Sequence, residues 1–256
     1  RVADTYHELW TRQVESVHAA LDDALSVRPG ERVLDLACGN GVHLIGMARR
    51  AAPSGLAVGV DLSAGMLEEA RRRAAEAGVA ARFVRAETAA FLRSARARFD
   101  AVTLRFALAY VRAADVFPAV ERLLAPGGRF GVLTNSRASC IQAWTVAEEM
   151  AREFEVETPP VGIPDDAAAL GAWLRAAGFR RYDIFDRGLR LRFGSGREVV
   201  DWLLQTGLAY HPLVDQVVPD VADFLAGEMG RRLEERFAAD GAVPLDLHFL
   251  VAVARA

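Results

Sequence analysis

The chain contains no lysine, and all 31 of its basic residues are arginines, against 34 Asp and Glu residues. An all-arginine set could indicate anion recognition, since the planar guanidinium fork matches carboxylate and phosphate. A coding bias that also raises the alanine content is the simpler interpretation. The formal net charge is only −3. Nucleic-acid binding depends on a basic surface that neutralises phosphates, so we expect no nucleic-acid partner.

Cysteine is scarce as well, and Cys38 and Cys140 stand far apart. Neither belongs to a C-x-x-C pair or lies near spaced histidines, which excludes the common zinc and redox motifs. No apolar run approaches the roughly 18 residues that span a bilayer, and no signal peptide is visible. We therefore expect a cytoplasmic protein with no membrane contact. The chain begins at Arg1 and not at Met, so leading residues can be missing from it.

Length and hydrophobicity allow a full core. The chain has 256 residues, of which 52% are hydrophobic, and domains commonly comprise about 100–200 residues. Such a chain needs no disulfide or metal to be stable, and its composition excludes disorder. No Ser/Gly-rich linker separates its halves, so we predict a single domain.

Short apolar runs alternate with helical patterns over the first half. The runs predict strands at 32–37, 56–60, 81–86, 100–105 and 129–134, with helices at 40–50, 63–78 and 114–124. This alternation indicates a parallel sheet that helices cover on both faces. The second half is less regular, with predicted helices at 139–154 and 165–177, strands at 179–185 and 247–253, and about sixty largely helical residues between those strands.

The sharpest signal is the segment 33–41, in which a strand runs into a tight glycine turn and then a helix. Such a turn brings backbone N–H groups and a helix N-terminus close to a ligand. A dinucleotide fingerprint reads G-x-G-x-x-G, but Gly39-x-Gly41 is followed by Leu44 at the third glycine position. Asp35, inside the strand, is not part of that fingerprint either. Glycine pairs alone are weak evidence, because tight turns use them widely.

Asp61 gives the second signal, about twenty residues further on, at the carboxyl end of the next strand. A carboxylate at this position can accept hydrogen bonds from both hydroxyls of a ribose. Alternatively, Asp61 only caps the helix that begins near Ser63. The glycine turn upstream favours ribose binding.

Together these segments resemble the class I S-adenosylmethionine-dependent methyltransferases, nearest to the ubiquinone/menaquinone-biosynthesis and small-molecule branch. The likeness covers roughly residues 30–135 and is loose outside them. Five motifs follow the family's order and spacing, at Val33–Gly41, Val58–Ser63, Phe83–Thr88, Phe99–Phe106 and Leu124–Arg129.

The resemblance implies a Rossmann-like α/β fold, a seven-stranded and mostly parallel sheet with an antiparallel last strand and helical lid insertions. Within one domain over 1–256, residues 1–30 would form an N-terminal helical cap and 31–135 the cofactor-binding core. Residues 136–256 would form an acceptor-side half with a helical insertion at about 187–243. The cofactor would be S-adenosylmethionine, and S-adenosylhomocysteine the product.

The resemblance also implies the residues of the cofactor site. Asp35 and the turn would hold the methionine end, Asp61 the ribose, and Arg105 with Phe106 would lie below the sulfonium. Ala37 replaces a common Gly and Glu87 a common Asp. The positions implied for cofactor binding are Tyr6, Trp10, Asp35, Ala37, Gly39, Asn40, Gly41, Asp61, Leu62, Met66, Ala86, Glu87, Thr88, Arg105 and Phe106.

Two assignments in this set have alternatives. Leu62 and Met66 would lie against the adenine, and either Glu87 or a neighbouring backbone amide would meet its amino group. Tyr6 and Trp10, four residues apart, would share a helical face that folds over the cofactor, as in similar enzymes. Otherwise they form an aromatic pair that packs on the sheet edge.

Methyl transfer is an in-line displacement at an activated carbon, and alignment alone supplies about 7–11 kcal/mol of the barrier. A base is needed only when the acceptor has a proton to lose. The chain lacks the Asn/Asp-Pro-Pro-Tyr motif of amino-group methyltransferases and a Pro-Cys nucleophile. No carboxylate follows the fourth strand to hold Mg²⁺. We therefore predict a metal-free enzyme acting on a small molecule.

His211 is the candidate base, and a loop histidine without a role is an equally weighted interpretation. His248 is expected to pack in the last strand, and His43 to have a role at the helix start or beside the cofactor. The candidate acceptor contacts are aromatic and favour an apolar or aromatic acceptor, a natural product or quinone-like ring. They are Tyr110, Trp144, Trp202 and Tyr210.

Several alternatives stay open at this point. The protein could bind S-adenosylmethionine and catalyse a rearrangement without methylation, or be a nicotinamide-dependent oxidoreductase, which the absent third glycine argues against. The helical insertion is compatible with a homodimer interface. The sequence does not decide between O-, N- and C-methylation.

Overall fold

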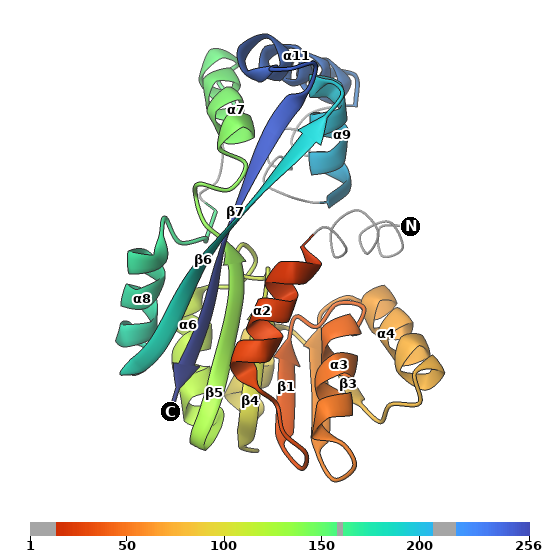
Figure 1. Cartoon of the computed structure of the whole chain (residues 1–256), viewed down its shortest axis with the longest axis vertical. Coiled ribbons are helices and arrows are strands. Elements are labelled where there is room, and N and C mark those ends of the chain that lie inside the picture. The colour runs from red at the N-terminus through yellow and green to blue at the C-terminus, as the bar shows by residue number, and fades with distance from the viewer. Residues whose placement is uncertain (1–13, 158–160, 207–218) are drawn as a thin grey trace. The chain divides into compact units, whose positions relative to one another are not determined.

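The computed structural model describes residues 14–157, 161–206 and 219–256, so the predictions for Tyr6, Trp10, Tyr210 and His211 lie outside the described residues (Figure 1). The strands are β1 (Arg32–Leu36), β2 (Leu56–Asp61), β3 (Arg82–Arg85), β4 (Phe99–Arg105), β5 (Leu124–Asn135), β6 (Arg181–Phe193) and β7 (Val243–Arg255). The helices are α2 (Glu15–Leu25), α3 (Val42–Ala51), α4 (Ala64–Glu76), α5 (Thr88–Ser94), α6 (Ala113–Leu123), α7 (Ile141–Glu153), α8 (Ala167–Ala176), α9 (Gly196–Thr206) and α11 (Pro219–Phe237).

The described chain divides into two compact units. The first, here called the sheet unit, comprises residues 15–136, 162–187 and 249–256. The second, here called the helical unit, comprises Val14 and the described residues of 137–161 and 188–248, and it holds α7, α9 and α11. Strands β6 and β7 contribute residues to both units. The single-domain organisation stays a prediction.

The sheet has seven strands in the order β3-β2-β1-β4-β5-β7-β6. The pairs among β1 to β5 are parallel, and β7 pairs antiparallel with β5. This confirms the predicted fold class. The strand order reverses at β1, which lies between β2 and β4, and in such sheets ligands bind beyond the carboxyl ends of the strands at this switch point.

Helices cover both faces of the sheet unit. Helices α5, α6 and α8 share one buried apolar cluster with the strands, to which Leu92, Phe117 and Leu174 contribute. On β5, a Cβ at Gly131 would come within 2.9 Å of leucine side chains of α2. The glycine therefore lets α2 pack closely on β5.

Local signals placed α4 correctly. The Ser63 hydroxyl accepts a hydrogen bond from the Met66 N–H at 3.3 Å and so caps α4, as predicted. The same helix ends at Glu76, and Gly78 follows with a φ of +64°. Glycine adopts this left-handed conformation without strain, which explains why the helix ends there.

Three strands are longer than predicted. Strand β5 already begins at Leu124, and its pairing with β4 jumps from Leu124 to Arg129, so the predicted Pro-Gly-Gly turn is an excursion within the strand. Strand β6 continues to Phe193 and β7 begins at Val243. The added half of β6 is largely exposed and rich in arginine, so no apolar run marks it.

The apolar stripe predicted at 221–237 is a core contact only in part. Leu225, Met229 and Leu233 of α11 are buried, whereas Val221 and Phe224 are exposed. The exposed Phe224 ring contacts the ring of Phe154 edge to face, with 6.1 Å between the centroids. Among the described residues no helix is long and apolar enough to cross a bilayer.

Candidate functional site

The glycine turn, here residues 37–41, leaves β1 in an unusual backbone conformation. Ala37, Gly39 and Gly41 have φ values of +54°, +51° and +77°. Gly41 is also sterically required, because a Cβ there would lie 2.9 Å from the Cβ of Ala70. Ala37 is not glycine, so its left-handed conformation is strained. Strain of this kind is characteristic of ligand sites.

Asp61, at the end of β2, holds the glycine turn and the following loop together. Its Oδ2 accepts the Gly39 N–H and its Oδ1 accepts the Ser63 N–H, both at 2.8 Å. A carboxylate has about four lone-pair positions, so each oxygen retains capacity for a ligand hydroxyl. The two interpretations of Asp61, ribose binding and a local structural role, are therefore compatible.

Asp35 is buried beneath the turn. Its Oδ1 accepts a hydrogen bond from the Thr103 hydroxyl of β4 at 2.6 Å, and only 2% of the residue is exposed. Burial raises the pKa of Asp35 to about 6, against the opposing effect of the nearby Arg105 charge. This carboxyl is thus less acidic than an ordinary aspartate and is responsive to a cationic neighbour.

Arg105, the last residue of β4, points its guanidinium at α2. Nη2 donates to Asp22 Oδ1 at 2.5 Å, and Nη1 lies 3.3 Å from His18 Nδ1 and 3.5 Å from the His18 carbonyl oxygen. The side chain is 4% exposed, and its Nε–H has no acceptor in the described part of the chain. The prediction that Arg105 lies below the sulfonium stays a prediction.

His18 connects this cluster with α3. Its ring stacks on the ring of His43, with 3.8 Å between the centroids and 20° between the planes. Burial, and then the charge of Arg105, lower the pKa of His18 to about 3. The ring is therefore neutral near pH 7, and its Nδ1 can accept the hydrogen bond of Arg105.

Phe106 follows Arg105 and also has a positive φ, of +51°. Its N–H donates to the Leu133 carbonyl at 2.7 Å, and its ring meets the edges of His18 and Phe249 with centroid distances of 5.4 and 5.7 Å. Ala37 and Phe106 thus strain the backbone just past the ends of two neighbouring parallel strands. That places the distorted backbone at the switch point.

The predicted adenine side lies around the end of β2. Leu62 is 65% exposed and Met66 half-buried, so apolar surface is available beside Asp61. The Ala86 N–H already donates to the Asp61 carbonyl at 3.0 Å. Since that amide is engaged within the protein, it is less suited to meet the adenine.

Glu87 acts as the N-cap of α5. Its two carboxylate oxygens accept the N–H groups of Ala89 and Ala90 at 2.8 and 2.6 Å, and these bonds lower the pKa of Glu87. Any bond from the adenine to Glu87 would share oxygens that already cap a helix.

Two further predicted cofactor positions are less exposed. Thr88, the first residue of α5, is buried, and Asn40 in the glycine turn is half-buried.

The predicted acceptor contacts fall in different units. Tyr110 lies in the sheet unit past β4 and is 76% exposed. Trp144 of the helical unit is half-buried, with the Arg137 guanidinium 5.9 Å from its ring. Trp202 is 6% exposed and packs against Phe193, which favours a packing role. The acceptor assignments stay predictions.

The structure also places the other two histidines considered in the sequence, His248 and His43. His248 is half-buried in β7, and its N–H donates to the Ser139 hydroxyl at 3.0 Å. His43 stands in the first turn of α3, as expected, against His18. Among the described residues, no three His, Cys, Asp or Glu side chains are arranged to hold a metal ion.

Sequence reasoning missed His18 and Asp22. Neither belongs to a motif of the likeness, which starts near residue 30. One signal was available, because His18 falls among Val17, Leu21 and Leu25 on the buried face of α2. A histidine at a core position implies a specific polar partner.

Comparisons with known proteins agree with this geometry. A family model described as a methyltransferase domain matches residues 33–128. Nocamycin O-methyltransferase of Saccharothrix syringae is 30% identical over 91% of this chain and 88% of its own length. A ubiquinone biosynthesis O-methyltransferase of Pseudomonas aeruginosa is 31% identical over 60% of this chain and 67% of its own. The crystal structure of YcgJ from Bacillus has a TM-score of 0.65 at 16% identity and covers 94% of this chain and 98% of that one.

Proposed function

Because the chain belongs to the class I S-adenosylmethionine-dependent methyltransferases, we propose that it methylates an oxygen of an apolar or aromatic metabolite, a natural product or quinone-like ring, without a metal. Its cofactor is S-adenosylmethionine and its acceptor a small molecule. The name of the Saccharothrix relative, an O-methyltransferase, suggests the oxygen specificity. The similarity to that relative extends over most of both chains.

The observation that carries the proposal is the cradle formed by the glycine turn and Asp61. Gly39 in the turn has a left-handed backbone and no side chain, and a Cβ there would meet nothing within 4 Å. Open space therefore lies beside its backbone. Asp61 keeps acceptor capacity for two hydroxyls, and exposed Leu62 offers an apolar surface next to it. A ribose joined to a flat purine ring matches this combination.

The chain's own residues have defined tasks in this proposal. Asp35 and the turn orient the amino-acid end, Asp61 orients the ribose, and Phe106 lies beside the reacting carbon. The sulfonium supplies a methyl group that is already activated. Alignment and exclusion of water therefore account for most of the catalysis. A hydroxyl acceptor must lose its proton, a task for which His211, outside the described residues, is the candidate.

The test is a direct assay of methyl transfer. The chain is incubated with S-adenosylmethionine carrying a labelled methyl group and a panel of a phenol, a hydroquinone, an aliphatic alcohol and an amine. We expect labelled phenol or hydroquinone ether together with an equal amount of S-adenosylhomocysteine. With S-adenosylmethionine well below saturation, an Asp61→Ala variant should form both products at least about tenfold more slowly.

Two outcomes contradict the proposal in different ways. Consumption of an acceptor without any S-adenosylhomocysteine would favour the rearrangement alternative. Binding of NADH with no binding of S-adenosylhomocysteine would favour the oxidoreductase.

A further inference from the structure

We propose that Arg105 is a positioning residue, which fixes α2 and, through the His18–His43 stack, the glycine turn that receives the amino-acid end of S-adenosylmethionine. This inference rests on the proposed function and specifies how one end of the cofactor site is held. It differs from the expectation from sequence, in which Arg105 itself meets the cofactor.

The geometry argues against direct contact. Both Nη groups are engaged by α2, through Asp22 at 2.5 Å and His18 at 3.3 Å, and the side chain is 4% exposed. An arginine that bound a ligand carboxylate would present two parallel donors to it. Here Nη2 is already occupied, so the guanidinium holds the protein and leaves no free fork for a ligand.

A chain of contacts leads from Arg105 to the turn. Nη1 faces His18 Nδ1, the His18 ring stacks on His43 at 3.8 Å, and His43 stands two residues after Gly41 in the first turn of α3. A second contact ties the same helices, because Arg50 of α3 donates to the Asp22 carbonyl at 3.1 Å. Displacement of α2 would therefore shift the helix start that continues the turn.

The cluster is poorly explained as a device for stability. Arg105 retains a buried Nε–H without an acceptor in the described chain, and His18 must stay neutral beside it. Buried ion pairs often stabilise a fold no better than apolar residues of similar size. Departures of this kind from local rules concentrate at functional sites, where a fixed geometry is needed.

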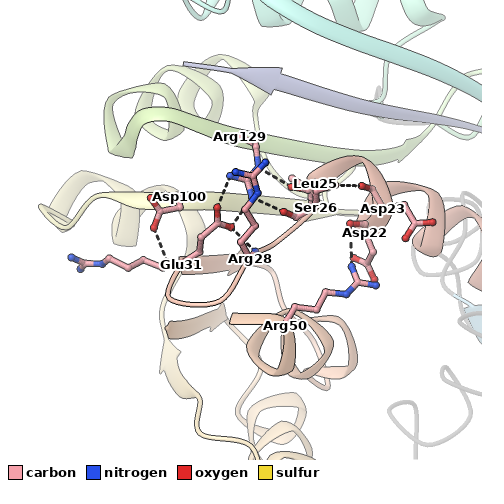
Figure 2. Close-up of polar contacts among 10 residues, drawn as sticks. Asp22, Asp23, Leu25, Ser26, Arg28, Glu31, Arg50, Asp100 and Arg129 are labelled. Carbon is pink, nitrogen blue, oxygen red and sulfur yellow. Dashed lines mark hydrogen bonds and ion pairs between the residues drawn. The ribbon is translucent and has the colours of Figure 1, made fainter. Parts of the chain in front are cut away.

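A second arginine, outside α2, also anchors this helix and provides a matched control. Arg129 of β5 forms a two-pronged ion pair with Glu31 at 2.7 and 3.0 Å, and its Nε donates to the Leu25 carbonyl at the end of α2, also at 2.7 Å (Figure 2). Arg129 therefore anchors α2 as Arg105 does, but at its last residue, Leu25, one turn beyond Asp22. Loss of Arg129 removes a helix anchor without removing the contact to His18.

The experiment compares two ligands by calorimetry. S-Adenosylhomocysteine carries the amino-acid end, whereas 5′-methylthioadenosine has the same adenine and ribose and lacks that end. We expect Arg105→Gln to weaken S-adenosylhomocysteine binding at least about tenfold and to change 5′-methylthioadenosine binding less than about twofold. Asp22→Asn, at a more exposed position, should act in the same direction, and Arg129→Gln should change neither affinity.

Further variants test the connection. Arg105→Lys keeps the charge but loses the fork, so it should recover only part of the affinity. The double variant Arg105→Gln/Asp22→Asn should bind no more weakly than Arg105→Gln alone, because both substitutions remove the same contact.

The remaining outcomes overturn the inference separately from the function. Equal losses for both ligands would mean that Arg105 supports the fold at large, and no loss for either would mean that α2 does not set the turn. If the unchanged protein bound neither ligand, the proposed function itself would fail.

Discussion

Asp61 has two tasks, since it bonds the backbone of Gly39 and Ser63 and is the proposed partner of the ribose. Asp61→Ala should therefore weaken S-adenosylhomocysteine binding by more than about tenfold, because charge-assisted hydrogen bonds are lost and the turn loosens. Calorimetric titration measures the affinity. Unlike Arg105→Gln, this variant should weaken 5′-methylthioadenosine binding as well, and unchanged affinity for both ligands would refute the ribose assignment.

The buried Asp35 carboxylate should lower the stability of the fold at neutral pH and at the same time strengthen cofactor binding. Its pKa is about 6 in the folded chain against 3.8 ordinarily, so its contribution to stability is complete below pH 4 and lost as the pH rises to about 6. The shift corresponds to about 3 kcal/mol at neutral pH. Asp35→Asn, which can still accept from Thr103, should thus be more stable than the unchanged protein at pH 7 and bind S-adenosylhomocysteine more weakly.

Urea unfolding at pH 4 and pH 7 measures this effect. The variant should gain stability relative to the unchanged protein only at the higher pH, since both carboxamide and protonated carboxyl are neutral at the lower one. A variant that is destabilised equally at both values would show that the Thr103 hydrogen bond outweighs the burial of charge.

The pKa shift of His18 affects the pH dependence of stability in the opposite direction from that of Asp35. Its pKa is lowered from 6.5 to about 3, so its contribution to stability is complete above pH 6.5 and lost as the pH falls towards 3. The full shift corresponds to about 5 kcal/mol, more than the opposing contribution of Asp35. Between pH 6 and 4 the two effects nearly cancel, so the unchanged protein should keep a nearly constant stability there and lose stability below about pH 4. In His18→Asn only the Asp35 effect remains, so this variant should gain stability as the pH falls from 6 to 4, which urea unfolding measures. Parallel slopes for both proteins would assign the acid sensitivity to other groups.

Among the elements, α9 and α11 cross unusually closely. A Cβ at Gly196 would lie 1.8 Å from the Gly230 carbonyl oxygen, and the Gly196 N–H donates to the Glu234 carboxylate at 3.0 Å. Gly196→Ala should cost at least about 3 kcal/mol, because a backbone atom cannot move aside as a side chain can.

Gly227 of α11 is the matched control. A Cβ there would meet nothing within 4 Å, so Gly227→Ala should stabilise the helix by about 0.5–1 kcal/mol. Thermal unfolding followed by circular dichroism compares the two variants. Similar melting temperatures would mean that the crossing can open without cost.

Elements differ in how far the sequence predicts them. Buried parallel strands such as β1 and β4 are mostly apolar in sequence, and Ser63 and Gly78 delimit α4 by local chemistry, so these were predicted almost to the residue. The end of β6 was missed because an exposed strand has no apolar run. The proposed ribose and turn positions follow from motifs, whereas the contact of Arg105 with His18 spans 87 residues and has no local signal.

For the whole molecule, the division into two units predicts where a bound ligand slows local unfolding. The described candidate cofactor residues all lie in the sheet unit. S-Adenosylhomocysteine at about 100 times its dissociation constant stabilises what it binds by about 2.7 kcal/mol. Hydrogen exchange should therefore slow in β1, β2 and β4 and stay unchanged in α9 and α11. Equal slowing in all of them would indicate that the units open as one.

The position of β7 has a consequence for synthesis on the ribosome. Strand β7 follows both β5 and β6 in the sequence but lies between them in the sheet. Until β7 leaves the exit tunnel, β5 ends the sheet as an unpaired edge and β6 has no strand to join. Phe249, which contacts Phe106, arrives with β7. The nascent chain thus exposes an aggregation-prone edge until β7 is made, and a chain cut before Val243 could not close its own sheet.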